Sequence, residues 1–286
     1  MIRTAAALFA LTAAANAQES FDIDRIEIED FIGTVLITID GGGPATLTIT
    51  QGDDVHEVEA RESGGALKID GDQNRRDWRR RGDFEEFLQE YPTLTIRAPE
   101  GVDLYLDDVV ASLSAGDLGD FVVKSSELIG AVGDVETARV GLAGSGDFTI
   151  GDVEGDARVS VAGSGDIEIG AVGGEARLSI AGSGEIDAGD VGQGVDISIS
   201  GSGSVHAESI NGEADASISG SGDVEIEDGR ASSLKVSIAG SGDFSFGGVA
   251  VDPKISVAGS GDVVLGGYEG SLRSSGNAKI RVKNKR

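Results

Sequence analysis

The chain has 286 residues with 50 acidic and 23 basic side chains, which gives a formal net charge of −27 at pH 7. This charge excludes general binding to nucleic acid or to an anionic membrane, because both surfaces are themselves negative. The chain has no cysteine, which excludes disulfide bonds and thiol chemistry.

The N-terminus has the features of a targeting segment. A basic "MIR" start precedes an apolar run of about a dozen residues, and the small-residue sequence Ala15-Asn16-Ala17 follows. We predict a signal peptide over residues 1–17, cut after Ala17. The alternative is a buried or membrane helix, but the run is too short to cross a bilayer. We therefore expect an exported mature protein without a transmembrane segment.

Residues 18–100 predict an irregular β region. Apolar residues alternate with polar ones at period two, as at Val35, Ile37 and Ile39, and Gly-rich turns separate such runs. A charged insert at 72–91 interrupts the alternation, and its last part, 83–91, predicts a short helix.

The insert concentrates five arginines around a tryptophan. This group could bind phosphate or sulfate groups or stack on a sugar. The alternative is a solvent-exposed loop that pairs with the acidic surface of the protein itself. The candidate ligand-binding residues are Arg75, Arg76, Trp78, Arg79, Arg80 and Arg81.

A repeated phrase, Gly-Ser-Gly-Asp or a close variant, dominates the rest of the chain. It starts at residues 144, 163, 182, 201, 220, 240 and 259, so the period is 19 with one step of 20. Period-two runs flank each phrase, which indicates strands joined at Gly-rich corners. We predict an all-β fold, a right-handed parallel β-helix over residues 101–283 with about 19 residues per coil. Its first coils, over 101–137, are degenerate.

The glycines of the phrase are expected at corners, where a positive φ is accessible without steric cost. If Gly165 has this conformation, Gly165→Val should destabilise the fold, because a β-branched side chain resists a positive φ. In the stacked coils, equivalent residues lie about 4.8 Å apart, in columns.

One column follows the phrase and is acidic. It comprises Asp147, Asp166, Glu185, Asp223, Asp243 and Asp262, with Ser204 as an interruption. Each carboxylate either accepts backbone N–H bonds at its corner or takes part in a row of Ca²⁺ sites. The known Ca²⁺-binding repeat has a different spacing and nine residues per unit, which favours the backbone interpretation.

A second column changes sign twice. It runs Arg139, Arg158, Arg177, Asp196, Asp215, Lys235, Lys254 and Arg273. We expect neighbouring acidic columns to pair with its basic members, at little gain per surface pair.

The tandem units "AGSGD" and "SGSGD" resemble the family called putative auto-transporter adhesin, head GIN domain, whose members are thought to form right-handed parallel β-helices. The resemblance implies an exported, adhesin-like protein, and it assigns no catalytic residues.

Motifs for catalysis are missing from the sequence: it has no HExxH, no GxSxG, and no GxG pair that precedes a helix. The regular coil length also argues against a walled active site. We expect a non-enzymatic envelope protein, an adhesin-like binding or scaffold β-helix, without a cofactor or metal.

Two alternatives remain at this stage, a polysaccharide-acting β-helix enzyme and a calcium-stabilised structural protein. The candidate partners are an envelope glycan, a glycolipid or a protein. The expected compartment is the periplasm, with the cell surface and the extracellular space as alternatives. The sequence does not indicate an oligomeric state.

Overall fold

A computed structural model describes residues 19–53, 56–71 and 84–284. The expected signal peptide at 1–17 and the candidate residues Arg75–Arg81 lie outside these ranges. The chain divides into two compact units, residues 1–135 and 136–286. The two units are described separately below.

Unit 1 is built almost entirely of strands around one central strand, β8. Its elements are β1 (Glu19–Phe21), β2 (Arg25–Glu29), β3 (Ile32–Ile39), β4 (Ala45–Thr50), β5 (Glu59–Ser63), β6 (Ala66–Asp70), α1 (Phe84–Leu88), β7 (Thr93–Ala98), β8 (Asp103–Ala115) and β9 (Leu118–Val132). Both β2 and β3 pair with β8 in parallel, along its first and second half respectively. Strands β2 and β3 therefore already form a coil that stacks on β8.

The irregularity expected for residues 18–100 comes from antiparallel additions to this coil. Strand β4 pairs antiparallel with β7 and with β1, and β5 pairs antiparallel with β6. The short helix expected at 83–91 is present as α1, over Phe84–Leu88. Its residues Phe87 and Leu88 are buried against Ile32 and Val110, which fixes the helix on the strands of unit 1.

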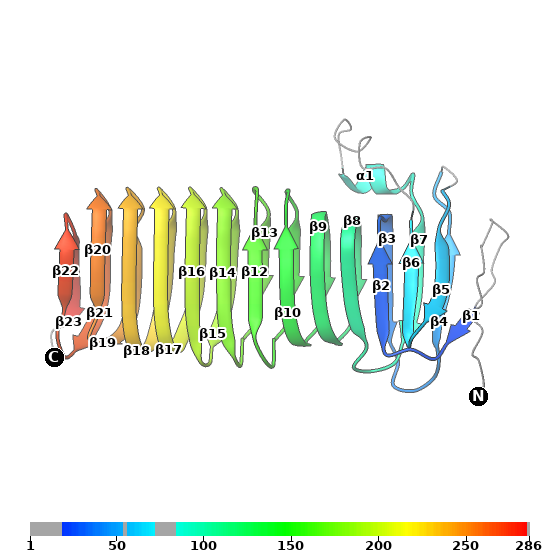
Figure 1. The fold of residues 1–286 in the computed structure, drawn as a ribbon, viewed down its shortest axis with the longest axis horizontal. Helices are drawn as coiled ribbons and strands as arrows, with labels where there is room; N and C mark the ends of the chain where they lie inside the picture. Colours follow the sequence, from blue (N-terminus) through cyan, green and yellow to red (C-terminus); the bar gives the residue numbers. More distant parts are fainter. Residues whose placement is uncertain (1–18, 54–55, 72–83, 285–286) are drawn as a thin grey trace. The chain divides into compact units, whose positions relative to one another are not determined.

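Unit 2 consists of two parallel sheets that share the same coils (Figure 1). The first sheet contains β10 (Val135–Leu142), β12 (Ala157–Val161), β14 (Glu175–Gly182), β16 (Gly194–Gly201), the second halves of β17 (Ser204–Gly220) and β18 (Asp223–Gly240), β20 (Lys254–Gly259) and β22 (Arg273–Gly276). The second sheet contains β11 (Asp147–Ile150), β13 (Asp166–Ile169), β15 (Glu185–Val191), the first halves of β17 and β18, β19 (Phe244–Val251), β21 (Asp262–Glu269) and β23 (Lys279–Asn284).

The register of unit 2 follows the 19-residue period, which confirms the predicted parallel β-solenoid. Val159 pairs with Leu178, and Leu178 pairs with Ile197. These side chains are at most 1% exposed, so one apolar column runs through the interior. The single step of 20 residues is absorbed between β17 and β18, where the register shifts after Gly212 and leaves Ser232 unpaired. Each coil buries its apolar edges against its neighbours, and the stack is stable only as a series of coils.

The two glycines of the repeated phrase have different roles. In the phrases that start at residues 163 to 259, the first has the positive φ, for example +152° at Gly182 and +137° at Gly201, whereas in the phrase that starts at 144 it is the second, Gly146. Gly165, a second glycine, does not meet the stated condition, because it is not among the positive-φ residues. The second glycine is required for space instead: a Cβ on Gly184 would lie 2.3 Å from the carbonyl oxygen of Gly165 in the preceding coil. The corner is tight because successive coils stack backbone on backbone.

Candidate functional site

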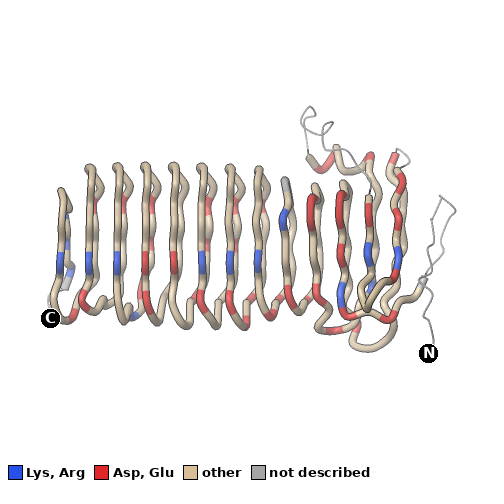
Figure 2. Tube along the Cα trace, viewed as in Figure 1, with Lys and Arg blue, Asp and Glu red and all other residues tan. Residues whose placement is uncertain are grey.

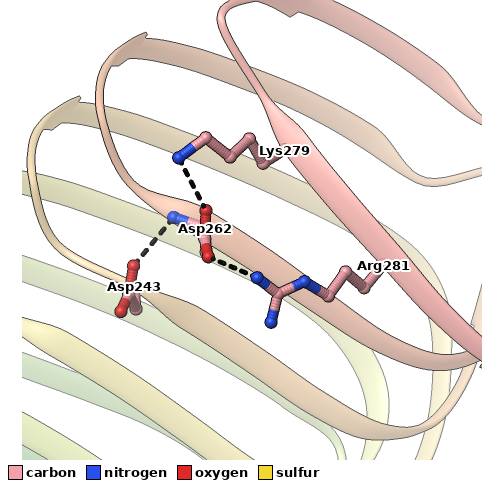
Figure 3. A network of polar contacts seen from close by, with 4 residues as sticks. All are labelled: Asp243, Asp262, Lys279 and Arg281. Atoms are coloured by element: carbon pink, nitrogen blue, oxygen red, sulfur yellow. Dashed lines mark hydrogen bonds and ion pairs between the residues drawn. The ribbon is translucent and has the colours of Figure 1, made fainter.

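The acidic column after the phrase is a structural ladder. The Oδ1 atom of Asp166 accepts the backbone N–H of Glu185 at 3.1 Å, one coil further on. Asp223 accepts the N–H of Asp243 at 2.9 Å, and Asp243 accepts that of Asp262 at 2.7 Å (Figure 3). At these three positions the backbone interpretation is confirmed, although the donor belongs to the next coil and not to the aspartate's own corner.

The last rung of this ladder also carries ion pairs. Asp262 lies 3.1 Å from the guanidinium of Arg281 and 3.7 Å from the amine of Lys279, as Figure 3 shows. Among the described residues, no group of three or more His, Asp or Glu side chains has the geometry to hold a metal ion.

The same inter-coil bond recurs at the other corners, which the sequence analysis missed. Asp156 Oδ1 accepts the N–H of Glu175 at 2.9 Å, and Asp252 Oδ1 accepts that of Ser271 at 2.8 Å. The backbone N–H and the hydroxyl of Ser271 hold the pKa of the Asp252 carboxyl below its usual value, and Arg273 and Lys254 act in the same direction. The sequence contained a signal for these bonds, since each donor residue follows its aspartate by one 19-residue period.

The sign-changing column lies on the outer face of the first sheet. Its eight members are in register, and Figure 2 shows them as a blue stripe that two red coils interrupt. The two red positions of the stripe are Asp196 and Asp215. On one side of the charged column is the column of Glu175, Gly194 and Glu213, and on its other side the next two outward columns contain only small exposed or half-buried side chains. These are Ser160, Ser179, Ser198, Ser217, Ser237 and Ser256 in one column, and Ala162, Ala181, Ser200, Ser219, Ala239 and Ala258 in the other.

Two ion pairs connect this column with its surroundings. Lys235 Nζ donates to Asp215 Oδ2 at 2.6 Å, and this hydrogen bond raises the pKa of the Lys235 amine. Arg177 lies 2.8 Å from Glu175. The expected pairing with neighbouring acidic residues is thus found at Arg177. Arg158, Asp196 and Glu213 form no ion pair with any residue in the described part of the chain.

A groove of about 400 Å³ opens on this face, beside the two aspartates. It forms because Gly194 stands between Glu175 and Glu213 in the register, so one coil lacks a side chain where its neighbours have one. The charged side chains that line the groove are Glu175, Arg177, Asp196, Glu213, Asp215 and Lys235. The floor is therefore acidic, and a basic group stands at each end.

On the second sheet, His206 lies between two carboxylates. Its Nε2 is 3.2 Å from Glu227 and its Nδ1 is 3.6 Å from Asp187, and the imidazole is 32% exposed. Both ring nitrogens are thus directed at neighbouring acidic side chains. The signal for this cluster was the 19-residue step from Asp187 to His206, which sequence analysis did not use.

The chain is a parallel β-solenoid whose first sheet has a charged outer face with a groove. Residues 171–268 match the family model described as "putative auto-transporter adhesin, head GIN domain", the family that the repeats resemble. The matched segment contains every residue that lines the groove. No curated protein matches the chain. Within the described ranges, no helix is long and apolar enough to span a membrane.

Proposed function

We propose that the chain is an exported, non-enzymatic binding protein of the cell envelope, adhesin-like, whose binding surface is the charged outer face of the first sheet. The observation that carries the proposal is the family match over residues 171–268, a segment that includes the whole groove. The family name points to adhesion to a surface molecule. The periplasm remains the proposed compartment, with residues 1–17 as the export signal.

The geometry of the face supports a binding role over catalysis. Where β14, β16, β17 and the second half of β18 stack around the groove, the only departure from the 19-residue step is the extra residue Ser232, so no loop rises beside the groove to enclose a substrate. The charged groups stand about one coil spacing apart in a regular row, which suits a repeating or extended partner. A polysaccharide-acting enzyme and a calcium-stabilised protein remain the alternatives.

A binding screen tests this role with defined probes. The mature chain would be presented to a panel of anionic, neutral and amine-bearing glycans and to a second preparation of itself. We expect binding to at least one probe, and loss of that binding when Arg158 and Arg177 are changed to Ser. The Glu168→Gln variant, altered at an exposed position of the second sheet, is the matched control. Release of shortened glycan products would favour the enzyme, and no binding to any probe would refute the proposal.

A further inference from the structure

The carboxylates of the groove are only partly neutralised by the protein itself. Four acidic and two basic side chains line the groove, so its net charge is −2. Two of the carboxylates are used in the ion pairs with Arg177 and Lys235 described above. The other two, Asp196 and Glu213, form no ion pair with any residue in the described ranges. The groove therefore offers two free carboxylates to a ligand.

The coils also keep a space open next to these carboxylates. Gly194 pairs in register with Glu213 and lies two residues before Asp196, so the missing side chain leaves room beside both acidic groups. A Cβ on Gly194 would lie 2.8 Å from the carbonyl oxygen of Glu213, which is closer than a carbon and an oxygen approach without a bond. A larger residue therefore does not fit on this backbone. Free carboxylates beside such a space are suited to a cationic group of a ligand.

Basic side chains without an ion pair stand further along the same column. Arg158 lies two coils before Asp196, about 10 Å away, and Lys254 lies two coils beyond Asp215. Neither basic group pairs with a residue in the described part of the chain. Figure 2 shows this order as blue, red and blue along the stripe. An extended ligand that lies across the strands therefore meets free acidic groups at the groove and free basic groups about 10 Å further on.

We propose that the ligand of this face is a zwitterionic glycan, a polysaccharide whose sugar units carry both ammonium and carboxylate groups. The proposal rests on the proposed binding role and names its ligand class. One ammonium lies in the groove against Asp196 and Glu213, and a carboxylate further along the same glycan chain lies against Arg158. The free charges of the protein then meet charges of opposite sign, which fixes the register of the glycan on the coils.

A ligand whose charges are all of one sign fits this face less well. A purely anionic polymer meets the free carboxylates of the groove, and the net charge of −27 repels it from a distance. A purely cationic polymer is attracted from a distance but meets Arg158 and Lys254 at contact. A ligand with both signs satisfies the acidic and the basic groups in the same register.

The serine column beside the charged column favours a sugar chain over a peptide. Ser160, Ser179 and Ser198 stand in register, one per coil, and a hydroxyl both donates and accepts hydrogen bonds, as the hydroxyls of a sugar do. An extended peptide places side chains on one face every second residue, about 6.8 Å apart, whereas the coils repeat at about 4.8 Å. A peptide that lies along the stack therefore loses register with the charged column. We assign the face to a glycan for this reason.

Titration calorimetry with matched oligosaccharides tests the proposal. The probe is an oligosaccharide of alternating glucosamine and glucuronic acid, which carries free ammonium and carboxylate groups. Its N-acetylated form has lost the ammonium groups, and its carboxyl-reduced form has lost the carboxylates. At about 0.15 M salt, the mature protein should bind the zwitterionic probe at least about tenfold more tightly than it binds either derivative.

Two variants assign each charge of the probe to a residue. Asp196→Asn should lower the affinity for the zwitterionic probe at least about tenfold, and this loss should vanish with the N-acetylated form, which has no ammonium. Arg158→Ser should lower the affinity in the same way, and its loss should vanish with the carboxyl-reduced form. Glu168→Gln, on the second sheet, is the control for both, and urea unfolding of all variants shows whether they remain folded.

The outcomes separate this proposal from the general binding role. Equal affinity for the zwitterionic probe and either derivative, or undiminished binding by both folded variants, overturns the zwitterionic ligand and leaves the binding role intact. Tighter binding of an extended Asp/Lys peptide, or binding only to another glycan of the panel, has the same meaning. If the protein binds neither these oligosaccharides nor any other probe, both proposals fail.

Discussion

At the scale of single residues, glycine has two separate functions in the repeated corner. From the phrase at Gly163 onward, the first glycine supplies a positive φ, whereas the second leaves room for the carbonyl of the preceding coil. The sequence predicted that glycine was required at this corner but did not show which of the two has the positive φ. The period-two pattern identifies a corner without giving its dihedral angles, because both glycines are compatible with any local conformation.

This distinction leads to a prediction about substitutions. Gly182→Val combines a φ of +152° with a Cβ that would lie 2.0 Å from the carbonyl oxygen of Gly163, so we expect a loss of about 2 kcal/mol or more in unfolding free energy. Gly165→Ala should cost less, because its Cβ would lie 3.0 Å from the nearest atom and φ is ordinary. Urea unfolding measures both, with the exposed Ser183→Ala as control. Equal midpoints for Gly182→Val and Gly165→Ala would contradict this account.

The inter-coil carboxylates predict a pH dependence. The pKa of Asp252 is lowered because its ionised form accepts two hydrogen bonds from Ser271. Its stabilising contribution is therefore complete above the unfolded-state pKa of about 3.9, and it is lost as pH falls through the lower folded-state value. We expect Asp252→Asn to be less stable than wild type at pH 6, with a difference that shrinks towards pH 3. A constant difference in urea midpoint across this range would argue against the carboxylate's charge as the cause.

At the scale of the element, the coil was the most predictable part of the molecule. Apolar alternation fixes which residues face inward, and the constant period fixes the partner of each residue, so the columns at Val159 and Arg158 followed directly from the sequence. The groove did not follow, although its cause is visible in the register: Gly194 occupies the position of a glutamate in the coils on either side. Sequence patterns predict where side chains stand more readily than the space left when one is missing.

A coil that contacts only its neighbours should be removable as a unit. Deletion of residues 165–183 removes 19 residues and joins Ser164 to Gly184, which preserves the phrase and the register. We expect a folded protein with β-type circular dichroism and a smaller urea slope, because less surface is exposed on unfolding. Deletion of residues 165–174 is the control, and it should unfold the unit because it shifts the columns out of register. Equal tolerance of both deletions would show that register does not determine stability.

At the scale of the whole molecule, the dominant physical fact is the excess of 50 acidic over 23 basic side chains. Stacking places equivalent charges about 4.8 Å apart, and like charges recur along the basic stripe at Arg139, Arg158 and Arg177. The acidic ladder offsets part of this repulsion through its backbone hydrogen bonds, such as that from Glu185 to Asp166. The remaining self-repulsion opposes the folded state and is weakened by salt.

The free energy of unfolding should therefore rise as sodium chloride is raised from about 10 mM to 150 mM, where the Debye length falls from about 30 Å to 8 Å.

The same experiment tests the calcium alternative. If the carboxylates act through backbone hydrogen bonds, calcium chloride and magnesium chloride should raise the urea midpoint as much as sodium chloride does at equal ionic strength. A small general effect of the divalent charge should be the same for both. A specific site would instead raise the urea midpoint with calcium alone, since a ligand that binds only the folded state stabilises it by mass action. Stabilisation by calcium that saturates and that magnesium does not reproduce would refute the interpretation of the acidic column as a purely structural ladder. The Asp243→Asn variant would then show whether that column is the site, because it replaces a carboxylate in the middle of the ladder and keeps an acceptor oxygen for the N–H of Asp262.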